Sequence, residues 1–206
     1  MPRKLAIRFL LGIWFGGLSL MGCTPDSLDY ESYLDHLQTQ RAVLSSEETA
    51  GSYRFSLTVE PSDLHAYRTL PDSVDTDQKW LEWSSQKSRY LYANLRISSL
   101  DPSKSVMDID TESPGAYGAR VSYLAFMAQH DLRLVTGQDT LAPQLYHFER
   151  TFEAAPFVNC QILFPEPPGS ANPVLHFDGG HFGVGPIHLE AKLDELKKLP
   201  TLNFPE

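Results

Sequence analysis

Strict alternation of apolar and polar residues is the feature that most constrains the fold of this chain. In the sequence YRFSLTVE at 53–60 every second residue is apolar, and the stretch 89–98 alternates in the same way. A period of two is typical of a β-strand that has one face in a core and the other in water. The chain is therefore expected to build sheets that each keep one wet face.

Further segments with strand character follow, and turn sequences such as 136–139 and 165–169 separate several of them. Roughly seven or eight strands without alternating helices predict an all-β domain, an antiparallel β-sandwich, over residues 51–206, although a barrel satisfies the same pattern. An open α+β sheet is the alternative, because helical segments near both ends would cover one face. The further strands are expected at 119–128, 131–136, 143–152, 157–164 and 173–178.

A helical stripe precedes the first strand. Asp26 or Ser27 would cap this helix, and acidic residues in its first turn complement the helix dipole. The helix would pack on the protein's own domain, hold that domain away from a membrane, or bind a partner. The members of the stripe, at steps of three and four, are Tyr30, Leu34, Leu37, Arg41 and Leu44.

Two further segments are less regular. The tail from Ile187 alternates as a strand does, while its composition favours a helix. We therefore expect a strand to about Leu193 and then one helical turn that ends at Pro200. The linker 61–86 is expected to contain a short helix around Trp80 and Trp83.

The first 22 residues have the pattern of a secretory signal peptide. A basic start that contains Arg3, Lys4 and Arg8 precedes an apolar stretch at 9–20. This stretch is shorter than the roughly 20 apolar residues that a membrane-spanning helix needs, which disfavours an uncleaved anchor helix. Export of the following chain is therefore expected.

The end of this segment, Leu20-Met21-Gly22-Cys23, resembles the lipobox of bacterial lipoproteins. The resemblance implies cleavage after residue 22, attachment of a diacylglyceryl group to the Cys23 thiol, and acylation of the new amino terminus. Several acyl chains on one residue make a durable membrane anchor. Residues 1–22 would then be the signal peptide, and 23–50 the lipidated terminus with its helical spacer. Thr24 follows the cysteine where an Asp would signal inner-membrane retention, which favours the outer membrane of a diderm bacterium.

The charge of the expected mature chain excludes one class of partner. Removal of the segment before Cys23, which holds three basic residues and no acids, leaves 14 Lys and Arg against 26 Asp and Glu, a formal charge of −12. This sign repels phosphate backbones, so nucleic acid is not expected as a partner. With Cys23 acylated, Cys160 is the remaining cysteine and no intrachain disulfide is expected.

Histidines and acids concentrate in the sequence HFDGGHFGVGPIHLE. If the strands on either side of its glycines pair as a hairpin, their polar side chains would gather into a set that suits zinc or another divalent metal. The alternative is that these residues are the solvated side of strands whose other side is core. The glycines lack the following Lys and helix of a phosphate loop, so no nucleotide cofactor is expected. The candidate metal ligands are His176, Asp178, His181, His188 and Glu190.

One strand face, with tryptophans shortly before it, has the residue types of a binding surface. Exposed aromatic rings beside polar groups suit proteins, peptides or glycans as ligands. The alternative is that the rings pair across strands or lie under the 61–86 linker. The candidate binding residues are Trp80, Trp83, Tyr90, Tyr92, Asn94 and Arg96.

No motif of a known catalytic site stands out, since neither Gly-x-Ser-x-Gly nor HExxH occurs. Cys160 has aliphatic neighbours on its own strand face, which predicts a buried, inert thiol. The sequence thus predicts a lipid-anchored extracytoplasmic lipoprotein with a non-catalytic binding or structural role at the bacterial cell envelope. The alternative is a metal-binding protein or metal-dependent enzyme that uses the cluster at 176–190.

Overall fold

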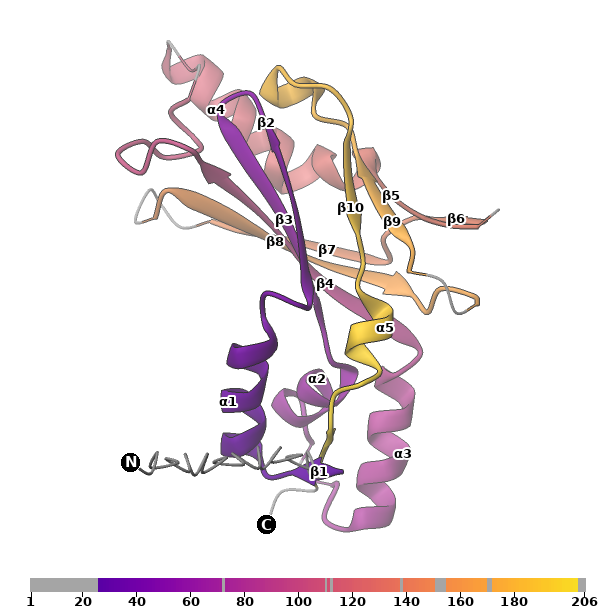
Figure 1. Cartoon of the computed structure of the whole chain (residues 1–206). Helices are drawn as coiled ribbons and strands as arrows, with labels where there is room; N and C mark the ends of the chain where they lie inside the picture. The colour runs from indigo at the N-terminus through magenta and orange to yellow at the C-terminus, as the bar shows by residue number, and fades with distance from the viewer. Residues whose placement is uncertain are drawn as a thin grey trace, which may run out of the picture.

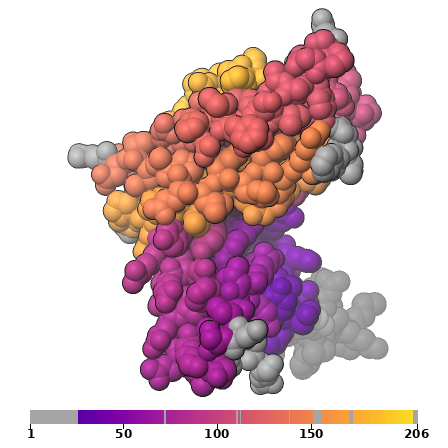
Figure 2. Space-filling view, turned by 180° about the vertical axis from the view of Figure 1, so that it is seen from behind, coloured from indigo at the N-terminus to yellow at the C-terminus, as the bar shows by residue number. Residues whose placement is uncertain are grey.

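The computed structural model describes residues 26–203 except 72, 110, 112, 138, 151–154 and 170–171. The predicted signal peptide and Cys23 lie outside the described residues. The described strands form three sheets, and the prediction of a β-rich fold is confirmed. Two larger sheets make up the upper part of the molecule in Figure 1, and three helices with a small sheet make up a base below them. Figure 2 shows the same division from behind.

The larger of the two upper sheets has five strands in the order β2-β3-β4-β8-β7, and every neighbouring pair is antiparallel. The alternating stretches of the sequence form its centre, as predicted. Its strands are β2 (Ser45–Ala50), β3 (Tyr53–Glu60), β4 (Tyr90–Ser99), β7 (Leu145–Glu149) and β8 (Phe157–Pro165).

The second upper sheet has four antiparallel strands in the order β10-β9-β5-β6. β5 and β6 form a hairpin, and Gly137 provides the positive φ of 58° that its tight turn requires. The strands are β5 (Leu132–Thr136), β6 (Asp139–Leu141), β9 (Val174–Phe177) and β10 (Ile187–Glu190).

The two upper sheets share one hydrophobic core. The inward residues of β3 and β4, such as Phe55 and Ile97, are fully buried. Leu134 and Leu175 on the second sheet are buried to the same extent and belong to the same cluster. Burial of such apolar area is the main stabilising contribution, at roughly 25 cal/mol per Å². Because each strand alternates, the same packing leaves the polar residues on the outer faces.

The base contains three helices and a two-stranded parallel sheet. These elements are β1 (Ser27–Leu28), α1 (Tyr30–Gln40), α2 (Ser62–Arg68), α3 (Asp77–Lys87) and β11 (Thr201–Leu202). The Asp29 carboxylate caps α1 by accepting a hydrogen bond from the Ser32 backbone N–H at 3.0 Å. Tyr33 of α1, Leu64 of α2 and Leu202 of β11 form a small core of their own. The base thus brings the two ends of the described chain together.

The predicted strand at 119–128 is wrong, because this segment is helical. It contains the end of α4 (Pro114–Ser122) and a π-helical turn at Tyr123–Met127. The Ser113 hydroxyl accepts a hydrogen bond from the Ala116 backbone N–H, and Pro114 occupies the first turn, where proline is tolerated. The residues that pack on the core, Tyr117, Val121, Leu124 and Ala128, follow helical spacing.

Other boundaries also differ from the expectation. Ser45–Ala50, expected within the helical spacer, is the edge strand β2. β10 ends at Glu190, before the expected Leu193, and the short helix α5 (Leu193–Leu196) follows it. In the linker, α3 carries both tryptophans as predicted, whereas α2 was not predicted. Among the helices of the described residues, none is both long enough and apolar enough to span a membrane.

Candidate functional site

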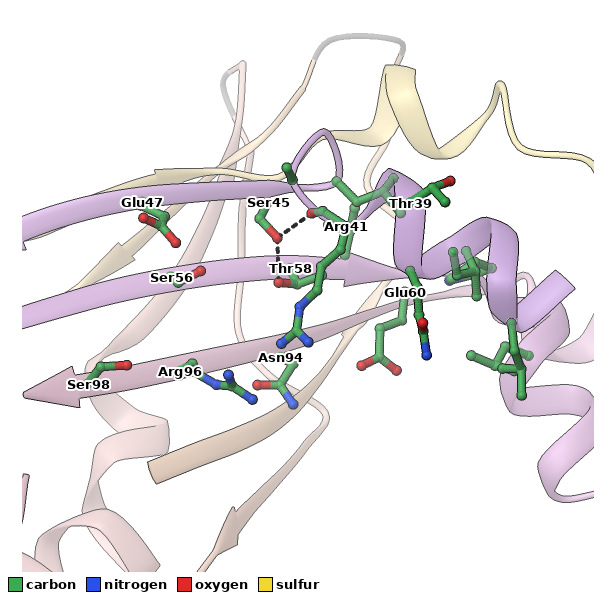
Figure 3. Close-up of a pocket in the computed structure, with 18 of the residues that line it drawn as sticks. Thr39, Arg41, Ser45, Glu47, Ser56, Thr58, Glu60, Asn94, Arg96 and Ser98 are labelled. Atoms are coloured by element: carbon green, nitrogen blue, oxygen red, sulfur yellow. Dashed lines mark hydrogen bonds between the residues drawn. The ribbon is translucent and has the colours of Figure 1, made fainter. Parts of the chain in front are cut away.

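A groove of about 1150 Å³ lies on the outer face of the five-stranded sheet, beside α1. Its floor comes from β2, β3 and β4, and its walls come from α1 and α2. Figure 3 shows its polar side chains over the strands. The charged and polar lining residues are Gln38, Thr39, Arg41, Ser45, Glu47, Arg54, Ser56, Thr58, Glu60, Arg68, Asn94, Arg96 and Ser98.

The alternation of β3 and β4 creates this floor. Because the apolar residues of both strands enter the core, every second residue faces the groove. The antiparallel register then sets Thr58 beside Asn94, and Ser56 beside Arg96. The floor is therefore a row of short polar side chains between longer charged ones.

The connection from α1 to β2 holds the wall against the floor. The Ser45 hydroxyl donates a hydrogen bond to the backbone carbonyl of Arg41 at 2.8 Å. It also shares a hydrogen bond of 2.7 Å with the hydroxyl of Thr58, as Figure 3 shows. These bonds fix the position of residue 41 relative to the end of β3.

The groove carries more positive than negative charge, although the whole chain has a formal charge of −9. Its two acids have basic partners: Glu47 lies 3.9 Å from Arg54, and the Glu60 carboxylate lies 2.8 Å from His65 Nε2. The remaining charged lining residues are the arginines 41, 68 and 96. A concave surface with this balance attracts anions.

Glu60 has a perturbed carboxyl group. Burial raises its pKa, but the hydrogen bond from His65, together with the charges of His65, Arg68 and Arg41, outweighs burial. The pKa of Glu60 therefore lies below its usual value, and the carboxylate is ionised at neutral pH.

Arg96 is held from the side of β8. Its Nε donates a hydrogen bond to Asn159 Oδ1 at 3.0 Å, and its guanidinium lies 4.1 Å from the centre of the Phe157 ring. Burial lowers the pKa of this guanidinium, the Arg41 charge lowers it further, and Glu149 partly offsets both. The side chain is thus fixed in direction beside another positive charge.

The predicted binding face divides in the structure. Asn94 and Arg96 line the groove. Tyr92 stacks on the ring of His65, with ring centres 3.8 Å apart and planes at 12°. Tyr90 begins β4 and is half-buried outside the groove lining.

The two tryptophans of that prediction belong to the packing of the base. Trp80 is 5% exposed and lies edge-on to Tyr67 of α2. Trp83 donates a hydrogen bond from Nε1 to the backbone carbonyl of Ala66 at 2.9 Å. Both contacts join α3 to α2, because the face of α3 that carries the indoles faces the neighbouring helix. The tryptophans therefore do not extend the row formed by Asn94 and Arg96.

The predicted hairpin of the histidine segment is present. β9 pairs with β10 so that His176 lies opposite His188, with ring centres 4.4 Å apart. Leu175 and Leu189, which alternate with these histidines, are buried as the core-face interpretation requires.

The other three candidate ligands have partners elsewhere. Asp178 accepts a hydrogen bond from the Gly180 backbone N–H at 2.9 Å, and His181 stacks on Tyr123 at 3.6 Å. The Glu190 carboxylate binds Lys192 and accepts a hydrogen bond from Asn172. Within the part of the chain that the structure describes, no three His, Cys, Asp or Glu side chains are placed to hold a metal ion.

Cys160 is buried in the core, as predicted, and is 1% exposed. Burial raises the pKa of its thiol to about 12, despite a hydrogen bond of 3.1 Å from the Tyr146 hydroxyl. The thiolate, which is the reactive form, is therefore strongly disfavoured.

Sequence reasoning missed several residues of the groove. Ser56, Thr58 and Glu60 are the polar members of the alternation whose apolar members predicted the strand. Arg41 was placed in the apolar stripe before the strands, where it was the one charged member. A charged residue in an otherwise apolar stripe was a signal for a polar contact surface.

Comparison of the chain with protein-family models, with curated proteins and with solved structures finds no match.

Proposed function

We propose that this protein is a lipid-anchored extracytoplasmic lipoprotein of the bacterial cell envelope that binds a ligand in the groove without transforming it. The anchor is Cys23, and the outer membrane is its location if the bacterium is diderm. The body that it carries is an antiparallel β-sandwich with a separate N-terminal helix. The lipobox resemblance of residues 20–23 and the acidic, exported composition support the cellular part of the proposal.

The groove is the observation that carries the binding role. Its volume of about 1150 Å³ is above the roughly 300–1,000 Å³ of typical small-molecule pockets, so the open groove has room for a drug-sized ligand, and such sites place a few polar groups to orient the ligand. Its hydroxyls at Ser45 and Thr58 bond to each other rather than to a general base. Hydroxyl, amide and guanidinium groups on one floor suit an oxygen-rich small molecule, such as a glycan or a short peptide.

The position of the groove supports a role near the membrane. α1 forms one wall and lies in the base, which also contains the first described residues after the proposed anchor. A ligand in the groove would thus be held on the side of the sheets that faces the base.

The anchor is tested by exchanging Cys23→Ser in the full-length protein. Metabolic labelling with radioactive palmitate and membrane fractionation should both be lost in the variant. A Ser variant that fractionates with membranes as the wild type does would contradict the lipid anchor.

The binding role is tested with a glycan array and a short-peptide array. The full-length protein in a neutral detergent should bind members of at least one array, and Ser56→Trp, which fills the floor, should abolish binding. Leu81→Trp, at an exposed position of α3, is the matched control and should bind as the wild type does. No binding to either array, or equal binding by Ser56→Trp, would contradict the role of the groove.

A further inference from the structure

We infer that Arg41 and Arg96 form an oxyanion clamp, which binds a carboxylate or phosphate group of the ligand between their guanidinium groups. The inference rests on the proposed binding function and names the ligand class for the groove. Three observations support it: the two side chains come from different elements, neither forms an ion pair, and the charge around them is positive.

The two arginines approach the same floor from different elements. Arg41 follows the last turn of α1, whereas Arg96 lies in the middle of β4. Figure 3 shows the Arg41 side chain extending past Thr58 toward Asn94, with the Arg96 guanidinium beside Asn94. Two segments far apart in the sequence thus direct cations to one place.

Neither guanidinium forms an ion pair within the described part of the chain, although the charge of Glu149 acts on Arg96. Arg41 makes no side-chain hydrogen bond or ion pair there, and Arg96 uses Nε on a neutral amide while its terminal nitrogens make no such bond. Glu60, whose pKa the Arg41 charge helps to lower, pairs with His65 at 2.8 Å. The clamp therefore keeps free N–H donors for a ligand.

Two like charges that face one groove repel each other, and this repulsion is relieved when an anion lies between them. The lowered pKa of Arg96, to which the Arg41 charge contributes, agrees with this arrangement. Guanidinium groups match the planar oxygens of carboxylate and phosphate and donate two parallel hydrogen bonds to them. The neighbouring Thr58 and Asn94 would bind the neutral part of the same ligand.

The test is a calorimetric titration of the full-length protein in a neutral detergent at low ionic strength. The probes are inorganic phosphate and, separately, citrate, which distinguish a phosphate from a carboxylate ligand. Saturable binding of at least one probe should weaken about tenfold or more in Arg41→Gln, because a charge-assisted hydrogen bond is lost. Binding should also weaken as salt is added.

Arg133→Gln is the matched control. It removes the same charge from β5 of the other upper sheet and should leave the affinity within about twofold of the wild type, because no direct contact is lost. Arg96→Gln should weaken binding as Arg41→Gln does. Because Arg96 also contacts Asn159, the thermal unfolding of the Arg96→Gln variant is measured as well. If this variant is unfolded, the test is decided by Arg41→Gln, since Arg41 is exposed.

The inference is overturned if neither anion binds saturably, or if Arg41→Gln binds both as the wild type does. It is also overturned if Arg133→Gln weakens binding as strongly as Arg41→Gln. If array ligands bind Arg41→Gln and the wild type equally but do not bind Ser56→Trp, the clamp is disproved and the binding role of the groove is retained. Retention of the Cys23→Ser variant in membranes would instead disprove the lipid anchor, and it would not change the result of the titration.

Discussion

The carboxylate of Glu48 joins the two upper sheets by accepting a hydrogen bond of 2.7 Å from the backbone N–H of His188. Glu48 belongs to the edge strand β2, and His188 to the edge strand β10 of the other sheet. Edge strands expose unpaired backbone groups that invite pairing with other chains. The Glu48 side chain binds one such backbone group on β10 and so connects the edges of the two sheets.

The exchange Glu48→Ala should lower the free energy of unfolding by about 1 kcal/mol, because the connecting hydrogen bond is lost. Urea denaturation measures the effect. Glu47→Ala on the same strand is the matched control, since its exposed pair with Arg54 at 3.9 Å contributes at most about 0.5 kcal/mol. Equal losses in the two variants would show that the connection has no energetic role.

Cys160 should behave as a small core residue. The exchange Cys160→Ala should cost about 1 kcal/mol through a small cavity, and Cys160→Asp should cost far more because it buries an unpaired charge. A thiol reagent should modify the native protein slowly and the denatured protein rapidly. Rapid modification of the native thiol would contradict its burial.

Cys160 also predicts a loss of stability in alkali. Its folded pKa of about 12 lies above the ordinary value of 9.0, so folding favours the protonated thiol. This contribution is fully present below pH 9 and declines as pH rises toward 12. Urea denaturation between these pH values should show a steeper decline for the wild type than for Cys160→Ala, and parallel curves would argue against it.

The lowered pKa of Glu60 predicts that the protein loses stability in acid. Its folded pKa is lowered from 4.5, so its contribution is present above that value and is lost as pH falls through the lower folded pKa. The free energy of unfolding should therefore fall more steeply below pH 4.5 for the wild type than for Glu60→Gln. Identical pH profiles would contradict the proposed balance of burial against His65 and the arginines.

Trp83 should stabilise the base rather than contact the ligand. The exchange Trp83→Phe removes the hydrogen bond to Ala66 and should cost about 1 kcal/mol in urea denaturation, with no change in ligand affinity. Leu81→Ala is the control on the same helix. Because Leu81 is 65% exposed, this exchange should change the free energy of unfolding by no more than about 0.5 kcal/mol. A weakened ligand affinity in Trp83→Phe would restore the tryptophan to the binding surface.

The central strands could be predicted from the sequence because their burial is one-sided. The strands β3 and β4 lie between neighbours in their sheet, so one face of each must be apolar, and the period of two records this constraint. The edge strand β2 has the sequence SSEETA and little apolar character to record. Its place in the sheet depends on pairing with β3, which no local pattern reveals.

A small part of the candidate site could be predicted for the same reason. Asn94 and Arg96 share a face of one strand, and local periodicity is sufficient to group them. Arg41 joins them because the chain folds back after α1, a tertiary event that spacing along the sequence does not report. The tryptophans were misplaced because an amphipathic helix does not indicate which neighbour its apolar side will meet.

The parallel pairing of β1 with β11 makes the two ends of the described chain depend on each other. Thr201 donates a backbone hydrogen bond to Asp26, and Asn203 donates one to Leu28. Loss of these donors would therefore release the amino-terminal strand as well. On a membrane-anchored molecule, each released residue would lengthen the tether by up to about 3.5 Å. If Cys23 anchors the protein as proposed, loss of the pairing between β1 and β11 would thus increase the distance that the body can travel from the bilayer.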